Sequence, residues 1–554
     1  MLYIFIASAI IFYLAYRYYG NFLNRKFQIN DSNTTPACTM NDGKDYLPTR
    51  SSVLFGHHFS SIAGAGPIVG PIIAGIAFGW LPALLWIVLG SIFIGGVHDY
   101  SSLVASIRHK ARSIGELAKN YMSKPAYKLF LLFIWLALVY ILVVFVDLTA
   151  TSYVESPAVA SSSGMFILLA LILGVLLKFT NLSLNKTSLI FVPLVFLCIF
   201  LGRMLPLDLS GMFSNLQMIW VILLLVYCFL ASTSPVWLLL QPRDYLSSFL
   251  LLGSLLVAFI GLLLGGLEMS YPAFTSWSDI ERGTLFPILF ITIACGACSG
   301  FHSIVSSGTT SKQLARETDA RRVGYGAMLV EGLLAVIALF TVVMLSQGSS
   351  LLNENPLMVF GNGIGRFIEA LGLPYDLGRT FGILAVSTFL LTTLDTASRL
   401  GRYIFEELFS FTFKGSKYIS TAITLLFPFL SVFITLHDVV GNPIPAWKAV
   451  WPIFGVTNQL MAGFALLVIY IWMRNKGKNY MFLLLPMFFM LIMTVWALGQ
   501  LIYQSGFTLL GYIAIFLLAL TIWLIVESIK SIKNLADKVK NDKEKEKVTA
   551  YAEN

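Results

Sequence analysis

The fold of this chain is decided by Gly56-His57-His58-Phe59-Ser60-Ser61-Ile62-Ala63-Gly64-Ala65-Gly66-Pro67-Ile68-Val69-Gly70-Pro71. This stretch begins an apolar run, residues 57–78, that is long enough to cross a bilayer. Its prolines and internal glycines must open the hydrogen-bond ladder of a helix. An unpaired backbone group in hydrocarbon costs several kcal/mol, so the stretch predicts a broken membrane helix whose freed groups are paired by protein, water or a ligand.

Apolar runs of similar length recur along the whole chain, from Leu2 to near Val526. Of its 554 residues, 57% are hydrophobic and 12% are charged, whereas about 25% of the residues of a soluble domain are charged. This composition leaves too little polar surface for a soluble fold. It predicts an all-α polytopic membrane protein with about fifteen transmembrane helices, at residues 2–19, 57–78, 81–107, 127–150, 163–179, 187–205, 216–238, 244–266, 286–306, 323–345, 379–400, 417–437, 449–471, 480–503 and 508–528.

A second interruption is expected about five spans after the first, within residues 216–238. It reads Ala231-Ser232-Thr233-Ser234-Pro235-Val236-Trp237, where hydroxyls can cap a new helix that has proline at its first position. Two broken helices that run in opposite directions are typical of inverted repeats. The spacing predicts a LeuT-like core of five plus five helices. The alternative is that glycine and proline only kink two ordinary membrane helices.

These elements divide the chain into four parts. We expect an N-terminal helix and cytoplasmic loop at residues 1–55 and a transport core at 56–400, with halves 56–205 and 216–400. Additional C-terminal membrane helices follow at 401–530. Residues 531–554 are rich in Lys, Asp and Glu and predict a solvated, partly disordered cytoplasmic tail.

The distribution of basic residues predicts the orientation of the chain in the membrane. The net charge is +9, but Lys and Arg are divided among short connections that share one side if the spans alternate. The charge therefore indicates topology rather than nucleic-acid binding, with the N-terminus outside and the C-terminus in the cytoplasm.

The run at residues 2–19 lacks a basic start and a cleavage site, so we expect it to be retained. Cys295-Gly-Ala-Cys298 has metal or redox spacing, but the five cysteines predict packing rather than disulfides or a metal site.

Four groups of motifs carry a family resemblance. They are Thr35-Pro36-Ala37 with Asn41-Asp42-Gly43-Lys44-Asp45-Tyr46 and residues 54–71; Pro235-Val236-Trp237-Leu238-Leu239 with Pro242-Arg243-Asp244-Tyr245-Leu246; Ser299-Gly300-Phe301-His302-Ser303 with residues 306–313; and Leu394-Asp395-Thr396 with Arg399-Leu400. Across most of residues 30–460 the chain resembles the carbon starvation (CstA) family.

The resemblance implies bacterial uptake of peptides or of pyruvate during carbon limitation, with proton coupling of pyruvate uptake in some members. It also implies kinship with the amino acid–polyamine transporter superfamily, which agrees with the predicted repeat. The chain is shorter than the larger family members and has no matched motif after about residue 470. The resemblance therefore implies the fold more strongly than the substrate.

The two breaks are expected to form the substrate site. Two helix N-termini that meet at the midplane, each with roughly half a positive charge, would favour a substrate carboxylate. Glycines allow a ligand to approach main-chain N–H groups, and hydroxyls add donors. The candidate substrate-binding residues are Ser61, Gly64, Ala65, Gly66, Ser232, Thr233 and Ser234. The alternative is that the hydroxyls only satisfy freed backbone groups.

Three histidines are candidates for ion coupling. His57 and His58 lie in the inner half of the first broken span, and His302 lies on the ninth span beside Ser299 and Ser303. With an ordinary pKa near 6.5, histidine can exchange a proton under physiological conditions. A buried histidine satisfied by a hydroxyl is the alternative. Zinc is disfavoured because adjacent residues diverge by about 100° on a helix.

Sodium is the rival coupling ion. Helix carbonyls around residues 60–63, with the hydroxyls of Ser299 and Ser303, could supply the oxygen ligands that a hard cation needs. The neighbouring histidines favour the proton.

Charged residues inside apolar spans add further candidates, because each costs about 3 kcal/mol to insert at a helix centre. Asp147, Glu331 and Asp395 are candidates for coupling, although Asp395 could simply pair with Arg399 one helical turn away. His98-Asp99 and Arg243-Asp244 lie near the predicted cytoplasmic helix ends. We expect them to latch an inner gate, with interfacial anchoring as the alternative.

The sequence thus predicts a secondary active importer of short peptides or small carboxylates, which alternates access around two broken helices in symport with protons. It is not expected to be an enzyme or to need a cofactor or metal. Its partners are the substrate, the coupling ion and the bilayer. A channel or solute sensor would need a continuous pore or a signalling domain. A metalloenzyme would use the three histidines with Glu331, and stoichiometric metal in the purified protein would favour it.

The histidine hypothesis predicts the behaviour of His58→Gln and His302→Gln. Each change should suppress gradient-driven accumulation of substrate more than equilibrium binding or exchange, because glutamine cannot carry the coupled proton. Uptake and counterflow in proteoliposomes measure the two effects. If both variants accumulate substrate like the parent between about pH 5.5 and 8, histidine titration is not the coupling device.

Overall fold

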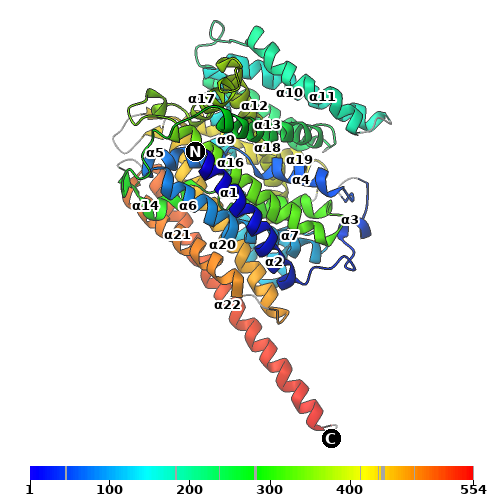
Figure 1. The fold of residues 1–554 in the computed structure, drawn as a ribbon. Helices are drawn as coiled ribbons and strands as arrows, with labels where there is room; N and C mark the ends of the chain where they lie inside the picture. The colour runs from blue at the N-terminus through cyan, green and yellow to red at the C-terminus, as the bar shows by residue number, and fades with distance from the viewer. Residues whose placement is uncertain are drawn as a thin grey trace.

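The apolar runs fold as helices because a helix pairs its backbone groups within one segment, as hydrocarbon requires. In the computed structural model the helices gather in one bundle, from which the end of α22 projects (Figure 1). The structure describes residues 1–43, 46–180, 184–235, 237–279, 283–411, 413–434, 436–437, 443–478 and 481–552, with the backbone alone for 184–185, 437 and most positions after 530. The predicted motif residues Lys44, Asp45 and Val236 lie outside the described residues.

The N-terminal half contains α1 to α11. Short π-helical turns join α1 to α2 and α6 to α7, so that each pair forms one continuous helix. The bounds are α1 Leu2–Leu14, α2 Gly20–Phe27, α3 Pro36–Thr39, α4 Ser51–Ile62, α5 Gly66–Phe78, α6 Trp80–Gly90, α7 Gly96–Arg108, α8 Ile114–Tyr121, α9 Lys124–Glu155, α10 Pro157–Phe179 and α11 Leu184–Met204, with π turns η1 Ala15–Tyr19 and η2 Ser91–Gly95.

Two helices, α12 Leu216–Thr233 and α13 Leu240–Leu264, precede the second half. That half contains α14 Leu285–Thr292, α15 Gly300–Gly308, α16 Ala327–Val343, α17 Pro356–Glu369, α18 Tyr375–Phe409, α19 Ser416–Ser431, α20 Ala446–Asn475, α21 Met481–Ser505 and α22 Leu509–Ala552. Its short helical turns are η3 Thr310–Lys312, η4 Glu317–Asp319, η5 Arg321–Gly326 and η6 Ser350–Asn353. Two small antiparallel hairpins pair β1 Ser278–Asp279 with β2 Gly283–Thr284 and β3 Leu436–His437 with β4 Pro443–Ile444.

The number of membrane spans is close to the prediction but lower. Twelve of the described helices are long and apolar enough to cross a membrane, and the bent pair α4–α5 makes up to thirteen. Two predicted segments, 286–306 and 417–437, fall short. The first is divided into α14 and α15, and the second, α19, has 16 residues. The tail after residue 530, expected to be partly disordered, continues α22 as far as Ala552.

The first predicted break is confirmed, whereas the second is wrong. α4 and α5 are bent by 46°, but α12 is an unbroken helix that ends at Thr233. The proline at 235 follows the end of a helix, a common position for proline because it cannot continue one. The second broken helix is α14–α15, which is interrupted at residues 293–299.

The order of elements repeats in the two halves. In each half a broken helix is followed by a long helix, a short helix, a helix of more than 30 residues and two further helices, namely α4 to α11 and then α14 to α20. Six candidate spans separate the two broken helices, which therefore run in opposite directions. This order favours halves of about 51–204 and 285–475 over the predicted 56–205 and 216–400.

The longest helices of the two halves, α9 and α18, pack along each other at the centre of the bundle, and α20 packs on α9. Beside them, α5 packs against α14 and α16, while α15 packs against α7 and α20. The two broken helices therefore lie next to each other. Their interrupted segments meet in the interior of the protein.

Close packing around the second break depends on glycine. A Cβ at Gly95 would lie 2.2 Å from the Ala297 carbonyl oxygen, and one at Gly70 would lie 2.5 Å from the Thr292 carbonyl oxygen. Both obstacles are backbone atoms, which cannot rotate away as a side chain can.

We predict that Gly95→Ala destabilises the protein by at least the 1–3 kcal/mol or so that overpacking costs. Gly164→Ala on α10 is the matched control, because nothing lies within 4 Å of its Cβ position and alanine favours a helix. Thermal unfolding of both variants in detergent measures the difference. Equal melting temperatures would show that the tight contact at Gly95 does not hold the break in place.

Candidate functional site

The first break is enclosed by protein on all sides. Residues 58–72 are all buried, and the Gly64 amide turns back to the Ile62 carbonyl oxygen at 2.8 Å. A Cβ at Gly64 would lie 2.4 Å from Thr393 Oγ1, and a Cβ at Gly66 would lie 2.3 Å from Cys295 Sγ. We expected a ligand to approach the main chain at these two glycines. In the structure, Thr393 of α18 and Cys295 of the second break occupy those positions instead.

The second break is held by side chains from two other helices, the continuous helix α6–α7 and α20. Trp86 Nε1 donates to the Ile293 carbonyl oxygen and Ser91 Oγ donates to that of Gly296, each at 3.1 Å. Asn458 on α20 caps α15, since its Oδ1 accepts from the Phe301 amide at 2.9 Å. Its Nδ2 donates to Ser299 Oγ at 3.0 Å. These bonds pair the backbone that the break leaves free.

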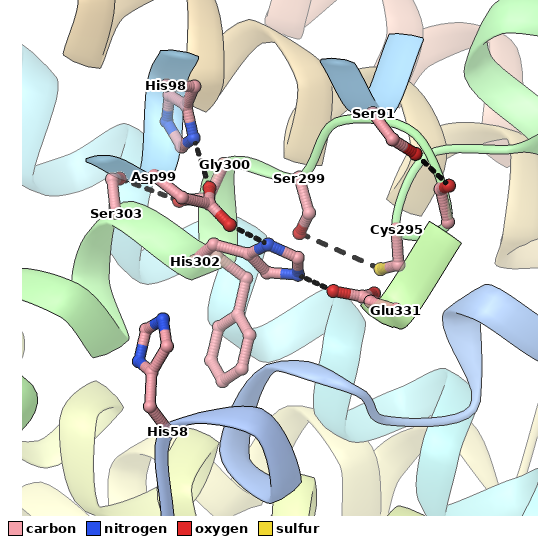
Figure 2. A network of polar contacts seen from close by, with 12 residues as sticks. His58, Ser91, His98, Asp99, Cys295, Ser299, Gly300, His302, Ser303 and Glu331 are labelled. Carbon is pink, nitrogen blue, oxygen red and sulfur yellow. Dashed lines mark hydrogen bonds and ion pairs between the residues drawn. The ribbon is translucent and has the colours of Figure 1, made fainter. Parts of the chain in front are cut away.

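His302, in the first turn of α15, joins two buried carboxylates (Figure 2). Its Nδ1 donates to Asp99 Oδ2 at 2.8 Å, and its Nε2 lies 3.5 Å from Glu331 Oε2. His98 Nδ1 donates to the other oxygen of Asp99 at 2.8 Å. None of these four side chains has exposed surface. We name His98, Asp99, His302 and Glu331 the His302 network.

The His302 network must hold a proton between His302 and Glu331. In a neutral His302 ring the single proton is on Nδ1, which donates it to Asp99. Nε2 would then be an acceptor facing the carboxylate of Glu331, which is also an acceptor. Neither oxygen of Glu331 has a hydrogen-bond partner among the described residues. An unpaired buried carboxylate is costly. The contact is favourable only with an imidazolium or with a protonated Glu331.

His57 and His58 point to different partners, as their adjacency predicts. His58 Nδ1 shares a hydrogen bond of 2.8 Å with Thr310 Oγ1 and lies beside the His302 network (Figure 2). His57 Nδ1 lies 3.3 Å from Asp244 Oδ2. Two adjacent residues of the half-helix α4 therefore face two separate groups of charges.

A second group of charges surrounds Arg243 at the start of α13. Arg243 Nη1 lies 2.5 Å from Asp395 Oδ2 and also donates to the Tyr227 hydroxyl, which itself donates to Asp395 at 2.9 Å. Ser61 Oγ donates to Asp244 Oδ2 at 3.4 Å. The proposed pairing of Asp395 with Arg399 is wrong. Arg399 instead donates to backbone carbonyls of α12.

The three hydroxyl residues expected at the second break lie elsewhere. α12 packs against α9, α18 and α19. Thr233 and Ser234 donate to carbonyls of their own helix, and Ser232 contacts Thr421. The carbonyls at this helix end accept from Arg399 and from Lys417. A helix C-terminus is negative and attracts these cations, so Ser232, Thr233 and Ser234 do not form an anion site with Gly64–Gly66.

The four residues expected to latch an inner gate are buried, and their role as a latch stays a prediction. His98, Asp99, Arg243 and Asp244 have no exposed surface. Interfacial anchoring is therefore wrong for them. Asp147, a candidate for coupling, lines a cavity of about 370 Å³. Its carboxylate accepts from Gln217 Nε2 at 2.7 Å and from the Trp447 amide at 2.8 Å, and so caps the start of α20.

The hydroxyls proposed for a sodium site make hydrogen bonds within the protein. Ser303 Oγ donates to the Gly300 carbonyl oxygen at 2.7 Å, and Ser299 is bonded to Asn458.

Sequence reasoning missed Asn458, Tyr227 and Thr393. For Asn458 a signal existed, because it is a polar amide in the middle of a long apolar run.

Two opposed broken helices thus cross in the interior of a membrane protein, beside a network of buried histidines and acids. The profile of the family described as carbon starvation protein CstA matches residues 1–356 and 348–497. The chain belongs to this family, as its motifs indicated, and it is a transporter rather than an enzyme.

Curated relatives are similar along most of their length. The peptide transporter CstA of Helicobacter pylori is 33% identical over 545 residues, which cover 86% of this chain and 78% of the relative. The pyruvate/proton symporter BtsT of Escherichia coli is 31% identical over 601 residues, which cover 92% of this chain and 83% of the relative. Both come from bacteria. The chain is a multi-pass membrane protein of this kind.

One solved structure shows the fold. It is the Eremococcus coleocola manganese transporter in complex with an aromatic bis-isothiourea substituted compound, with a TM-score of 0.52, 11% identity and coverage of 90% of this chain and 99% of that one. The likeness supports the predicted LeuT-like architecture. At this identity it carries no information about the transported solute.

The capping of α15 by Asn458 can be tested. We predict that Asn458→Ala destabilises the protein by about 1–3 kcal/mol, because it leaves a helix N-terminus and a buried hydroxyl unpaired. Thr457→Val is the matched control, since Thr457 bonds only to carbonyls of its own helix. Thermal unfolding should separate the two variants clearly. Equal effects would mean that Asn458 does not hold the second break.

Proposed function

We propose that this protein imports short peptides or small carboxylates such as pyruvate in symport with protons, by alternating access around the crossing of its two broken helices. The observation that carries the proposal is the contact of His302 with both Asp99 and Glu331. It joins the half-helix α15 to α7 and α16 through a shared proton. Loss of that proton would leave two buried carboxylates around one neutral ring, which disfavours this arrangement of the helices.

The substrate class rests on the relatives, whose names give peptides in one case and pyruvate with protons in the other. Proton coupling is favoured over sodium because the hydroxyls of Ser299 and Ser303 are bonded within the protein. The positions of Lys and Arg support an N-terminus outside and a C-terminus in the cytoplasm of a bacterial inner membrane.

Uptake by the purified protein in proteoliposomes tests this function. Labelled pyruvate and labelled dialanine should each be offered with an inward proton gradient, an inward sodium gradient or none. We expect the proton gradient alone to drive accumulation of at least one of them, and His302→Gln to abolish accumulation while counterflow persists. Accumulation driven by sodium would contradict the coupling. Failure of both solutes under every gradient would contradict the substrate class.

A further inference from the structure

The guanidinium of Arg243 is hydrogen-bonded through Nη1, whereas the edge formed by Nε and Nη2 makes no hydrogen bond within the described residues. Its Nη1 contacts Asp395 and Tyr227. Its Nε and Nη2 are fully buried, and neither has a hydrogen-bond partner among the residues that the structure describes. The nearest acid on that side, Asp244, has its Oδ1 3.8 Å from Nη2, beyond hydrogen-bond distance. Unpaired buried donors are rare in native proteins and require an explanation.

The two free donors are the ones that recognise a carboxylate. Nε–H and Nη2–H lie in the guanidinium plane and point in parallel from the same edge, so they can bind both oxygens of one carboxylate. We propose that this edge of Arg243 binds the carboxylate of the transported substrate. The inference deepens the proposed function and rests on it. The carboxylate of the substrate would therefore bind to Arg243, between α4, α12, α13 and α18, and not to the helix N-termini that the sequence predicted.

Charge balance links this site to the proton. Arg243 carries one positive charge, and Asp244 and Asp395 carry two negative charges, so the group already has a net charge of −1 when His57 is neutral. A substrate carboxylate would make it −2, which is costly for buried charges unless a proton enters with it. His57, 3.3 Å from Asp244, is the group that can accept this proton.

The other titratable groups near Arg243 do not supply a positive charge that could replace the proton. The Tyr227 hydroxyl and the Cys228 thiol on α12 are neutral at physiological pH. The guanidinium of Arg399 on α18 is bound to carbonyls of α12. The side chain of His57 is 12% exposed, whereas those of Arg243, Asp244 and Asp395 are 0–2% exposed. His57 is therefore the most exposed of these four residues, although its Nε2 is buried. The carboxylate and the proton bind together, which is the requirement for symport.

Binding of acids and of their neutral amides tests the assignment. The probes are pyruvate with pyruvamide and dialanine with dialanine amide, added to the purified full-length protein in lipid nanodiscs. The parent should bind each acid about 5- to 150-fold more tightly than its amide, as expected for charge-assisted hydrogen bonds. Acid binding should strengthen as the pH falls from about 8 to 6, because a proton is taken up with it, whereas amide binding should change little.

Arg243→Lys keeps the charge but removes the two-donor edge. It should reduce the preference for acid over amide to about threefold or less, chiefly by weakening acid binding. Arg399→Lys is the matched control, because it alters another buried arginine, whose hydrogen bonds within the described part of the chain go to backbone carbonyls. It should keep the acid preference. If Arg243→Lys fails to fold, Arg243→Met combined with Asp395→Asn removes one charge of each sign and should likewise lose the preference.

The outcomes separate this inference from the proposed function. Equal affinities for acid and amide in the parent, or an unchanged acid preference in Arg243→Lys, would overturn the assignment while leaving uptake intact. Acid binding that depends on Arg243, without accumulation under any gradient, would overturn the proposed function and support the assignment. Binding of none of the probes would overturn both.

Discussion

The rest of this structure depends on one constraint, which is that backbone groups freed inside the membrane must find partners inside the protein. Two helices are interrupted, at residues 63–65 and 293–299, and each interruption is packed against the other. Gly66 lies so close to Cys295 that no side chain fits between them. Trp86, Ser91 and Asn458 pair the free backbone of the second break. The long helices α9, α18 and α20 enclose this crossing.

The same crossing brings two groups of buried charges to one half-helix. Adjacent residues on a helix diverge by about 100°, so His58 faces the His302 network and His57 faces Asp244. Movement of α4 would therefore change both groups together. In each group the carboxylates outnumber the permanent positive charges, so a proton on a histidine or an acid would lower the cost of burying the group. This arrangement links the position of a broken helix to protonation.

The ends of α4 and α15 are also joined outside the crossing. The amides of Leu47 and Thr49, just before α4, donate to the carbonyls of Lys312 and Gln313, just after α15. Glu317 then accepts from Arg108 on α7 and from the Asn30 amide. The N-terminal loop thus connects the half-helices of both breaks.

The sequence by itself determined the class of protein, the first break and the candidate acids and histidines. These follow from local properties, because a run of about 20 apolar residues must span a bilayer and proline with glycine must open a helix wherever it lies. Only the tertiary structure decided the second break and the partners. Ser234-Pro235 is consistent with either the start or the end of a helix, whereas residues 293–299 contain no proline and a single glycine. That segment is open because groups distant in the sequence pair its backbone. Likewise, Asp395 lies within a turn of Arg399 in sequence, yet Arg243, on another helix, contacts it. Charge pairs in a buried site are set by which helices meet, and no local pattern specifies that.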